Sequence, residues 1–389
     1  MTTTELTKEI KTRIETYTYD SIDEAIELAK EHGTDVFFDK FLGELRLTCD
    51  IYNSDHVCSD AKFFNRGMRV KESHFTYRAL LGLVNVASKG SKASQFRKKV
   101  EEIYLIGHIW EKGDVYGGNV DLKYMSTFTK IAKIHIEEAG SISNLELINN
   151  FGKLKALSVC GMNDSSDKIP SSLNSIPMVS NNLKLPRIEW SCNALEELSF
   201  QFVQEIDDLS FLSKLKKIRK INFYACDLKS FAGIPDSIEH FSCVSSRLRK
   251  SLSREEYNLL GFLKKIKTLE IELADSDFLF LSELNDLEQL KISCCSNLMD
   301  INSLKNAKNL RSITFKECEN LANIEGIENL KNICEVEFID CPCLEDISSI
   351  SRFTHLKYLN VKGCVNLKVK PEKYILDKEE DIKGYLEKW

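Results

Sequence analysis

The chain has 389 residues, of which 43% are hydrophobic and 29% are charged, a composition typical of a folded protein with a buried core. Its formal net charge of −6 argues against a general binder of nucleic acid or of anionic membranes. No apolar run approaches the roughly 18 residues of a membrane span, and the first ten residues lack the apolar core of a secretory signal. We therefore expect a cytoplasmic protein with neither a nucleic-acid nor a membrane partner, although export without a cleaved signal stays open.

The first 99 residues contain no repeated pattern. Ser21–Lys30 predicts a helix, the alternating aromatic run Asp35–Tyr52 predicts a β-hairpin, and Phe75–Ala87 predicts a buried helix. The polar and basic residues 88–99 predict a junction. We expect a small α+β domain or an N-terminal cap over residues 1–99.

Motifs that would indicate catalysis are missing from the sequence, which has no G-x-x-x-x-G-K-[ST] phosphate loop, G-x-S-x-G elbow or H-E-x-x-H pair. His74, with Cys49, Cys58 and Asp55, is the only polar cluster of the first 99 residues that hints at chemistry. Cys/His catalysis needs a base within hydrogen-bond reach, and a structural role is the simpler interpretation. We predict no catalytic residue, no cofactor and no metal site, so we do not expect an enzyme.

From Val100 onwards, an apolar pattern of three positions, Φ-x-x-Φ-x-Φ, recurs about a dozen times. The last two apolar positions alternate with polar ones, as a half-buried strand requires. One weak match, Leu173–Met178, contains Pro177, which cannot donate to a strand ladder, so this stretch is either a strand or a loop. The better matches before the last hundred residues start at Val100, Ile131, Leu154, Leu195, Ile218, Ile238 and Ile266.

Two insertions interrupt the period. The step from Val100 to Ile131 is enlarged by a glycine-rich stretch around residues 113–118, which predicts a loop. The step from Ile238 to Ile266 is enlarged by a predicted helix, for which Ser253 and Glu256 form a capping-box signature. Such insertions often take part in binding, and tolerated growth of a loop is an equally good explanation.

The pattern becomes regular near the C-terminus, where four segments follow L-x-x-L-x-L-x-x-C-x-x-L with conservative replacements. Their starts, at positions 287, 310, 333 and 356, are evenly spaced by 23. A constant period of this kind is the signature of stacked repeats that each bury an apolar face against the next. The segments are Leu287–Leu298, Leu310–Leu321, Ile333–Leu344 and Leu356–Leu367.

The chain has 13 cysteines, and five of them occupy the same place in successive repeats. Because they are spaced by the period rather than in pairs, they favour a ladder of buried free thiols, whose S–H groups reach nearby carbonyls, over disulfides or a zinc site. These five are Cys226, Cys295, Cys318, Cys341 and Cys364.

A helical cap is predicted after Pro371. Asp377 and Glu380 form a second capping signature, and Ile382, Tyr385 and Trp389 follow at helical spacing. An apolar stripe of this kind can cover the open end of the last repeat.

The motifs LKISCCSNL, ITFKECENL, VEFIDCPCL and LNVKGCVNL resemble the leucine-rich repeat family. The Cys-x-x-Leu turn is similar to the cysteine-type repeats of F-box substrate receptors, and the short return with paired isoleucines is similar to bacterial internalin-type repeats. The resemblance implies an α/β solenoid: a leucine-rich repeat horseshoe with a parallel β-sheet on the concave face. The predicted domains are residues 1–99 as the N-terminal α+β domain or cap, residues 100–370 as the solenoid and residues 371–389 as the C-terminal cap.

Proteins of this family usually bind other proteins along the concave sheet. The strand positions that alternate with the apolar ones are therefore the candidate binding residues, with ordinary solvated strand positions as the alternative for any single one. They are Glu197, Tyr224, His240, Glu270, Glu272, Lys291, Lys316, Glu335, Glu337, Tyr358 and Asn360.

The function that these observations favour is recognition of a protein partner without catalysis. A cytosolic inhibitor, such as an immunity protein against a toxin, or an adaptor is our preferred role. The alternatives are an effector delivered into another cell, for which the threonine-rich start is weakly suggestive, and an unrecognised activity in residues 1–99 that the repeats direct to a substrate.

Overall fold

The computed structural model describes residues 1–16, 18–33, 78–79, 81–111, 114–161, 183–185, 189–244, 252–272 and 278–389. The hairpin predicted for Asp35–Tyr52, the doubtful strand Leu173–Met178 and the His74 cluster lie outside these residues. Contacts divide the chain into two compact units: unit 1 is Met1–Glu196 with Phe200–Gln204, and unit 2 is Glu197–Ser199 with Glu205–Trp389. The domain boundaries predicted at residues 99 and 370 stay predictions.

Among the described residues, the main sheet has twelve strands in the order β1-β5-β7-β9-β11-β12-β13-β14-β15-β16-β17-β18. The pairs from β11 to β17 are parallel, and β18 returns antiparallel to β17. The predicted leucine-rich repeat solenoid with a parallel sheet is confirmed. The strands of this sheet are β1 Glu102–Ile106, β5 Lys133–Ala139, β7 Ala156–Gly161, β9 Glu197–Gln201, β11 Lys220–Tyr224, β12 His240–Val244, β13 Thr268–Glu272, β14 Gln289–Ser293, β15 Ser312–Lys316, β16 Glu335–Ile339, β17 Tyr358–Asn360 and β18 Ile375–Leu376.

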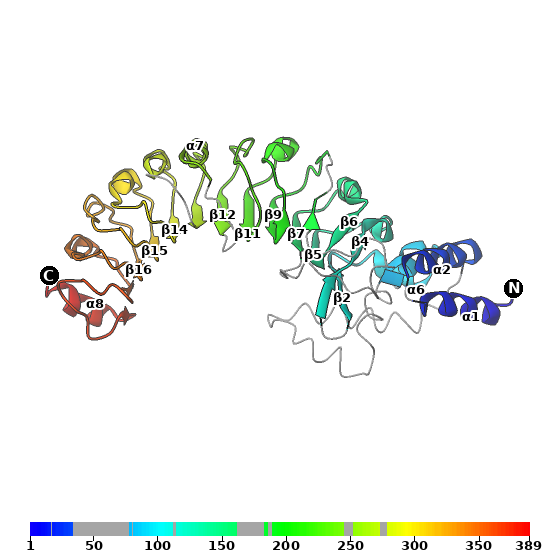
Figure 1. Ribbon diagram of the computed structural model, residues 1–389. Coiled ribbons are helices and arrows are strands. Elements are labelled where there is room, and N and C mark those ends of the chain that lie inside the picture. The colour runs from blue at the N-terminus through cyan, green and yellow to red at the C-terminus, as the bar shows by residue number, and fades with distance from the viewer. Residues whose placement is uncertain are drawn as a thin grey trace. The chain divides into compact units, whose positions relative to one another are not determined.

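Short 3₁₀ helices form the return side of most described repeats. Within unit 2 they lie on the outer side of the coils and the strands on the inner side (Figure 1). None of the described helices is long and apolar enough to cross a membrane. The 3₁₀ helices are η1 Leu122–Met125, η2 Leu145–Asn150, η3 Ser210–Lys214, η4 Leu260–Phe262, η5 Leu279–Glu283, η6 Asn302–Asn306 and η7 Ser348–Arg352.

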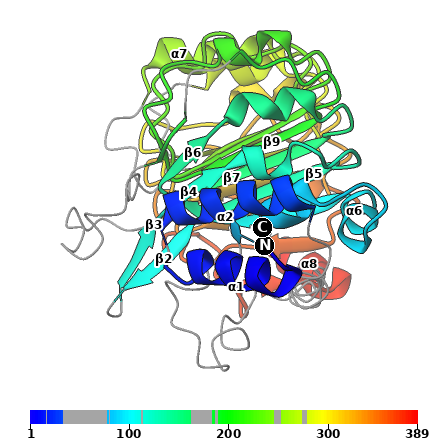
Figure 2. The same cartoon turned by 90° about the vertical axis from the view of Figure 1, so that its right-hand side faces the viewer.

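Unit 1 begins with two helices that lie side by side, α1 (Thr3–Ile14) and α2 (Tyr19–His32), as Figures 1 and 2 show. The helix predicted at Ser21–Lys30 is therefore confirmed. Thr2 is the N-cap of α1 and forms a capping box with Glu5, so the threonine-rich start has a structural role that the sequence analysis missed.

The rest of unit 1 corrects one prediction. The polar residues 88–99 contain a short helix, α6 (Lys92–Arg97), and their role as a junction stays a prediction. The glycine-rich insertion is a β-hairpin of β2 (His108–Glu111) and β3 (Asp114–Gly117) rather than a loop. Residues 81–86 are helical with buried Leu81 and Leu83, so the described part of the predicted buried helix is confirmed. The described part of the unit also contains two small parallel pairs: β4 (Asn119–Asp121) with β6 (Ser141–Ser143), and β8 (Leu183–Lys184) with β10 (Val203–Gln204).

A buried arginine joins α2 to the first repeats of unit 1. Arg78 is 7% exposed, lies over the rings of Tyr19 and Tyr124 at 4.4 and 4.7 Å, and pairs with Asp121 at 3.7 Å. Asp23 of α2 in turn accepts hydrogen bonds from Tyr124 and Lys123. Because a buried charge needs both a partner and hydrogen bonds, this network fixes how the N-terminal helices pack on the first coils.

In unit 2, every coil places equivalent apolar side chains in the same core column. The side chains of Phe315 and Phe338, which are opposite each other in β15 and β16, stack with ring centroids 5.9 Å apart. The predicted thiol ladder is present: its five cysteines are at most 4% exposed. Cys341 and Cys364 donate to the carbonyls of Phe315 and Phe338 at 3.5 and 3.2 Å. Together with Cys318, which lies 3.8 Å from the Ile292 carbonyl, these thiols tie the last three turns to the strand of the preceding coil.

Each of the last strands is followed by a residue in the left-handed conformation, again at the period of the repeats. Cys294, Glu317 and Asp340 have φ of 55°, 55° and 52°, and Gly363 has φ of 78°. The N–H groups of the first three donate to carbonyls of the next coil. The acceptors are Lys316 and Ile339, each the last residue of its strand, at 2.8 Å, and Lys362 in the turn after β17, at 2.7 Å. This recurring turn keeps successive coils in register.

The inserted helix α7 (Arg254–Leu259) begins where predicted, but without the predicted capping box. Within the described chain, Ser253 makes no side-chain hydrogen bond to cap α7. The carboxylate of Glu256 instead accepts from Ser230 Oγ and from the backbone N–H of Phe231, both at 2.8 Å. Glu256 therefore binds residues of the preceding coil instead of capping its own helix.

The C-terminal helix α8 (Glu379–Leu386) buries Ile382 and Tyr385, and the Tyr385 hydroxyl donates to the Val369 carbonyl at 2.8 Å. Its N-cap is Lys378, which has no side-chain cap bond in the described structure, so the capping signature at residues 377–380 is wrong. The apolar stripe packs against the last coil all the same, because burial decides helix packing more strongly than one cap bond does.

Candidate protein-binding surface

The side of the unit 2 strands that faces away from the core is a continuous surface, here called the open face. In β13, for example, Leu269 and Ile271 are buried whereas Glu270 and Glu272 are partly exposed. The register places the outward side chains of β11 to β17 in three rows, with neighbouring strands about 4.8 Å apart. The first row is Lys220, His240, Thr268, Gln289, Ser312, Glu335 and Tyr358; the second is Asn222, Ser242, Glu270, Lys291, Thr314, Glu337 and Asn360; the third contains Tyr224, Val244, Glu272, Ser293, Lys316 and Ile339.

The lysines of the open face are engaged by neighbouring carboxylates. Lys291 Nζ lies 2.6 Å from Glu270, which also accepts from Ser242 Oγ at 2.9 Å. Lys316 lies 3.1 Å from Glu317, and this pairing lowers the pKa of the Glu317 carboxyl. The third described lysine of the open face, Lys220, lies 3.6 Å from the candidate residue Glu197 of β9. Neighbouring carboxylates of the same sheet and its turns therefore largely neutralise the positive charges of the open face.

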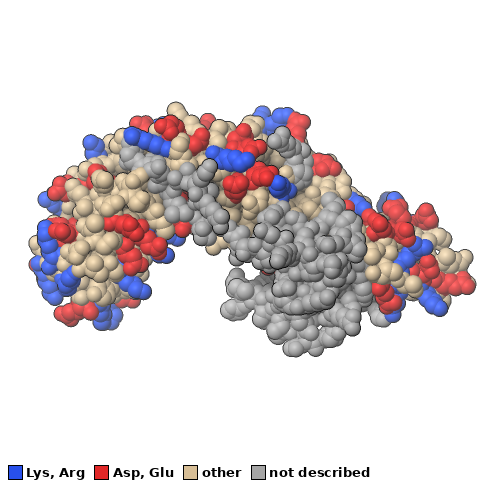
Figure 3. Space-filling model, viewed as in Figure 1, with Lys and Arg blue, Asp and Glu red and all other residues tan. Residues whose placement is uncertain are grey.

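Carboxylates remain in excess towards the C-terminal end of the open face. Glu337 accepts from Asn360 Nδ2 at 3.0 Å and from Thr314 Oγ1 at 3.4 Å, while its strand neighbour Glu335 is exposed. Among the described residues, no lysine or arginine forms an ion pair with either glutamate. Acidic side chains also gather on the C-terminal repeats in the space-filling view (Figure 3).

Two tyrosines and a histidine give the open face an aromatic component. Tyr224 is 46% exposed at the end of β11, and His240 of the next strand is half-buried. Tyr358 stands opposite Glu335, and burial together with the charge of Glu337 raises the pKa of its phenol. Aromatic side chains of this kind often anchor protein interfaces.

One candidate residue belongs to a different environment. Asn360 is only 5% exposed, because β18 pairs with β17 and places Ile375 opposite it. Its side chain holds Glu337 and accepts from the backbone N–H of Lys362 at 3.1 Å. Asn360 thus positions Glu337 and offers little contact area of its own, and its place among the candidate binding residues stays a prediction.

The residues that border the open face are not among those predicted from the sequence. Asp340 lies in the left-handed turn directly after β16, and Ile375 of β18 is 49% exposed. Asp340 could have been predicted from the sequence, because it stands one repeat period before Gly363, a glycine at the same place in the next repeat. Ile375 could not, because it joins the sheet through an antiparallel return that the repeat pattern does not contain.

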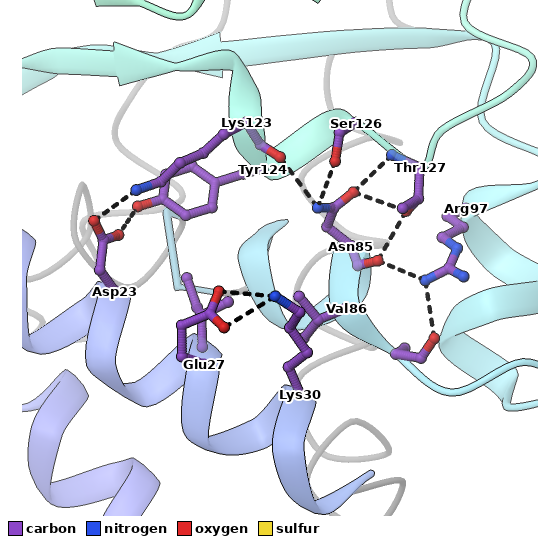
Figure 4. A pocket seen from close by; sticks show the side chains of 12 residues that line it. Asp23, Glu27, Lys30, Asn85, Val86, Arg97, Lys123, Tyr124, Ser126 and Thr127 are labelled. Carbon is purple, nitrogen blue, oxygen red and sulfur yellow. Dashed lines mark hydrogen bonds and ion pairs between the residues drawn. The ribbon is translucent and has the colours of Figure 1, made fainter.

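A hollow of about 450 Å³ lies in the described part of unit 1, between α2 and the residues around Asn85 and Thr127 (Figure 4). Its polar groups bind one another: Lys123 pairs with Asp23 at 2.6 Å, and Asn85 accepts from the backbone N–H of Thr127 at 2.9 Å. Arg97 donates to three carbonyls at the end of the helical segment 81–86 and just beyond it. These contacts support the packing of α2, and they do not outline a ligand.

The fold and the open face together define a leucine-rich repeat protein. The chain belongs to the family of BspA-type leucine-rich repeat regions, whose model matches residues 129–243 and 276–368 in six copies, together more than half of the chain. Repeats of this family typically bind proteins and usually have no catalytic role. No curated protein matches the sequence.

Solved structures with a similar fold include two internalins from Listeria monocytogenes. Internalin C2 has 15% sequence identity and a TM-score of 0.38, and the match covers 66% of this chain and 88% of that one. The internalin inlF has 14% identity and a TM-score of 0.43, with coverage of 75% and 92%. The leucine-rich repeat domain of the type III effector XopL has 14% identity and a TM-score of 0.34, with coverage of 86% and 90%.

Proposed function

We propose that this protein is a non-enzymatic recognition protein that binds another protein through the open face of unit 2. The observation that carries the proposal is the open face itself: rows of outward side chains in register across seven strands, with Tyr224 and Tyr358 among them. A repeated sheet of this kind offers contact area and aromatic anchors on a rigid support, which are the requirements of a specific interface.

Within this class we propose a cytosolic inhibitor, such as an immunity protein, or an adaptor. The acidic net charge and the absence from the sequence of the catalytic motifs sought above support this choice. Delivery into another cell and an activity in the first 99 residues stay predictions. Thr2 supports neither, since its side chain caps α1.

The proposal is tested by capture of partners from the native lysate with the tagged full chain and two variants. The first variant, Glu335→Lys/Glu337→Lys/Tyr358→Ala, alters the open face. The control, Glu319→Lys/Glu325→Lys/Leu279→Ala, makes the same changes of charge and truncates one large apolar side chain, all at exposed positions outside the strands. We expect one stoichiometric partner that is held by the native chain and the control and lost by the first variant. A partner retained equally by all three proteins would overturn the proposal.

A further inference from the structure

The open face has a distinct region at its C-terminal end, here called the acidic patch: Glu335, Glu337, Asp340, Tyr358 and Ile375. Glu335 and Glu337 project from the same strand about 6.6 Å apart, since successive outward residues of a strand are two positions apart. Tyr358 stands opposite Glu335, and Asp340 follows the end of β16. Glu335 and Glu337 thus lie beside one partly exposed aromatic ring, and Asp340 adds a third carboxylate beyond the far end of β16.

The charge of the acidic patch is not balanced within the described structure. The lysines of the open face pair with Glu197, Glu270 and Glu317, and no ion pair reaches Glu335, Glu337 or Asp340 among the described residues. Two exposed lysines flank the strand β17: Lys357 immediately precedes it, and Lys362 lies two residues after its end. Three patch carboxylates against two flanking cations leave the patch with a net negative charge.

The patch is also partly preorganised. Hydrogen bonds from Asn360 and Thr314 fix the carboxylate of Glu337, so little side-chain freedom is lost when a cation binds it. On the other side of Asn360, in β18, Ile375 is 49% exposed and offers an apolar contact. A fixed carboxylate, an aromatic ring and an apolar side chain in one place match the three parts of an arginine side chain or a lysine side chain: charge, cation–π surface and aliphatic stem.

We propose that the partner presents a basic segment to the acidic patch, with an arginine as its central residue. The inference rests on the proposed function and names the chemistry of its partner. The guanidinium is placed between Glu335 and Glu337, with its plane on the ring of Tyr358 and its methylene groups against Ile375. Arginine is favoured over lysine because its planar fork can bind a carboxylate through two hydrogen bonds and stack on an aromatic ring simultaneously.

The proposal is tested with labelled peptides of about a dozen residues, in which alanine alternates with arginine, lysine or glutamate. Their binding to the full chain is measured by fluorescence anisotropy at about 0.05 and 0.3 M salt. We expect the arginine peptide to bind best, the lysine peptide more weakly and the glutamate peptide not at all. Tyr358→Ala should reduce the preference for arginine.

The decisive comparison is between two variants with the same net charge. Glu335→Gln/Glu337→Gln should weaken binding of the arginine peptide about tenfold, and Glu319→Gln/Glu325→Gln, outside the strands, less than about twofold. Equal effects of the two variants would show that the peptide follows overall charge and would overturn the proposal. Thermal melts that match the native chain establish that both variants are folded.

The native partner separates failure of this inference from failure of the proposed function. Loss of the partner with Glu335→Gln/Glu337→Gln and on raising the salt would support a basic segment. A partner lost with Tyr358→Ala but retained by Glu335→Gln/Glu337→Gln at both salt concentrations would leave the proposed function standing and refute the basic segment. A partner retained by all open-face variants would refute both.

Discussion

Cys294 and Cys295 are adjacent in sequence but differ in environment. Cys295 is fully buried in the thiol ladder, whereas Cys294 is partly exposed in the left-handed turn after β14. The Cys294 thiol lies 3.3 Å from a Glu317 oxygen and 3.6 Å from a Glu272 oxygen. Burial, the hydrogen bond to Glu317 and the negative charge of both glutamates raise the pKa of Cys294 to about 12.

This environment predicts slow alkylation of Cys294. Because the thiolate is the reactive form, the rate at pH 8 should be far below that of the exposed Cys343, and it should rise about tenfold per pH unit up to pH 11. Glu317→Gln removes a negative charge and a carboxylate acceptor, so it should lower the pKa and accelerate the reaction at pH 8. Glu319→Gln is the control and should leave the rate unchanged. Peptide mass spectrometry after iodoacetamide treatment measures each site, and equal rates in the two variants would contradict the assignment.

Gly363 provides a second prediction at the level of single residues. Its φ of 78° is unfavourable for residues with a Cβ, and a Cβ at this position would overlap the carboxylate of Asp340. Gly363→Ala should therefore cost about 2 kcal/mol of unfolding free energy. In an Asp340→Gly background the overlap with the carboxylate is removed and only the close contact with the Cα of residue 340 is left, so the cost should fall to about 1 kcal/mol. Urea unfolding of the four proteins measures this coupling, and the same cost in both backgrounds would argue against stacked turns.

At the level of elements, the docking of α7 depends on one carboxylate. Glu256→Ala should leave the N–H of the buried Phe231 without its acceptor, at a cost of about 2 kcal/mol. Ser253→Ala should cost less than about 0.5 kcal/mol, since Ser253 provides no cap bond in the described structure. Urea unfolding of the two variants distinguishes this arrangement from the capping box, in which the two residues would matter equally.

The strands of the last four repeats could be predicted because their signal is local and periodic. Leu290 and Ile292, for instance, alternate with polar residues and recur one period later as Ile313 and Phe315. Stacking then follows, since no coil can bury this face alone. The same alternation identified the outward side chains of the open face, and of those residues only Asn360 is buried.

The contacts that decide each candidate's role could not be predicted in the same way. Glu256 fits a capping box in sequence, but its acceptor atoms serve residues 25 and 26 positions away. The pairing of Lys291 with Glu270 links strands whose separation in sequence departs from the regular period. Such interactions depend on register and on returns such as β18, which a propensity or a short motif does not encode.

At the level of the whole molecule, a solenoid should tolerate removal of one complete coil. Deletion of residues 310–332 removes one full period and joins Asn309 to Ile333, so that Ile333 takes the place of Leu310. In the intact chain, Thr314 of the strand to be deleted pairs with Lys291 on one side and with Glu337 on the other. After the deletion, Lys291 would therefore stand opposite Glu337. We expect a folded chain with a melting temperature lowered by a few degrees, since one nearest-neighbour interface is lost.

Deletion of residues 313–332, which is slightly shorter than a full period, is the matched control. It removes nearly the same mass but shifts every later turn against the strand before it. Circular dichroism and size-exclusion chromatography compare the two proteins. If the control folds as well as the deletion of a complete coil, the coils are not the units of stability.

The thiol ladder also allows the order in which the coils unfold to be measured by chemical labelling. Each of Cys226, Cys295, Cys318, Cys341 and Cys364 is shielded by its own coil, and a buried thiol reacts only once that shield has opened. A brief pulse of alkylating agent during partial unfolding would leave a permanent mass tag on every coil that was open at that moment. Tags read peptide by peptide at successive times would then give the order in which the coils separate, from five markers that the chain already carries.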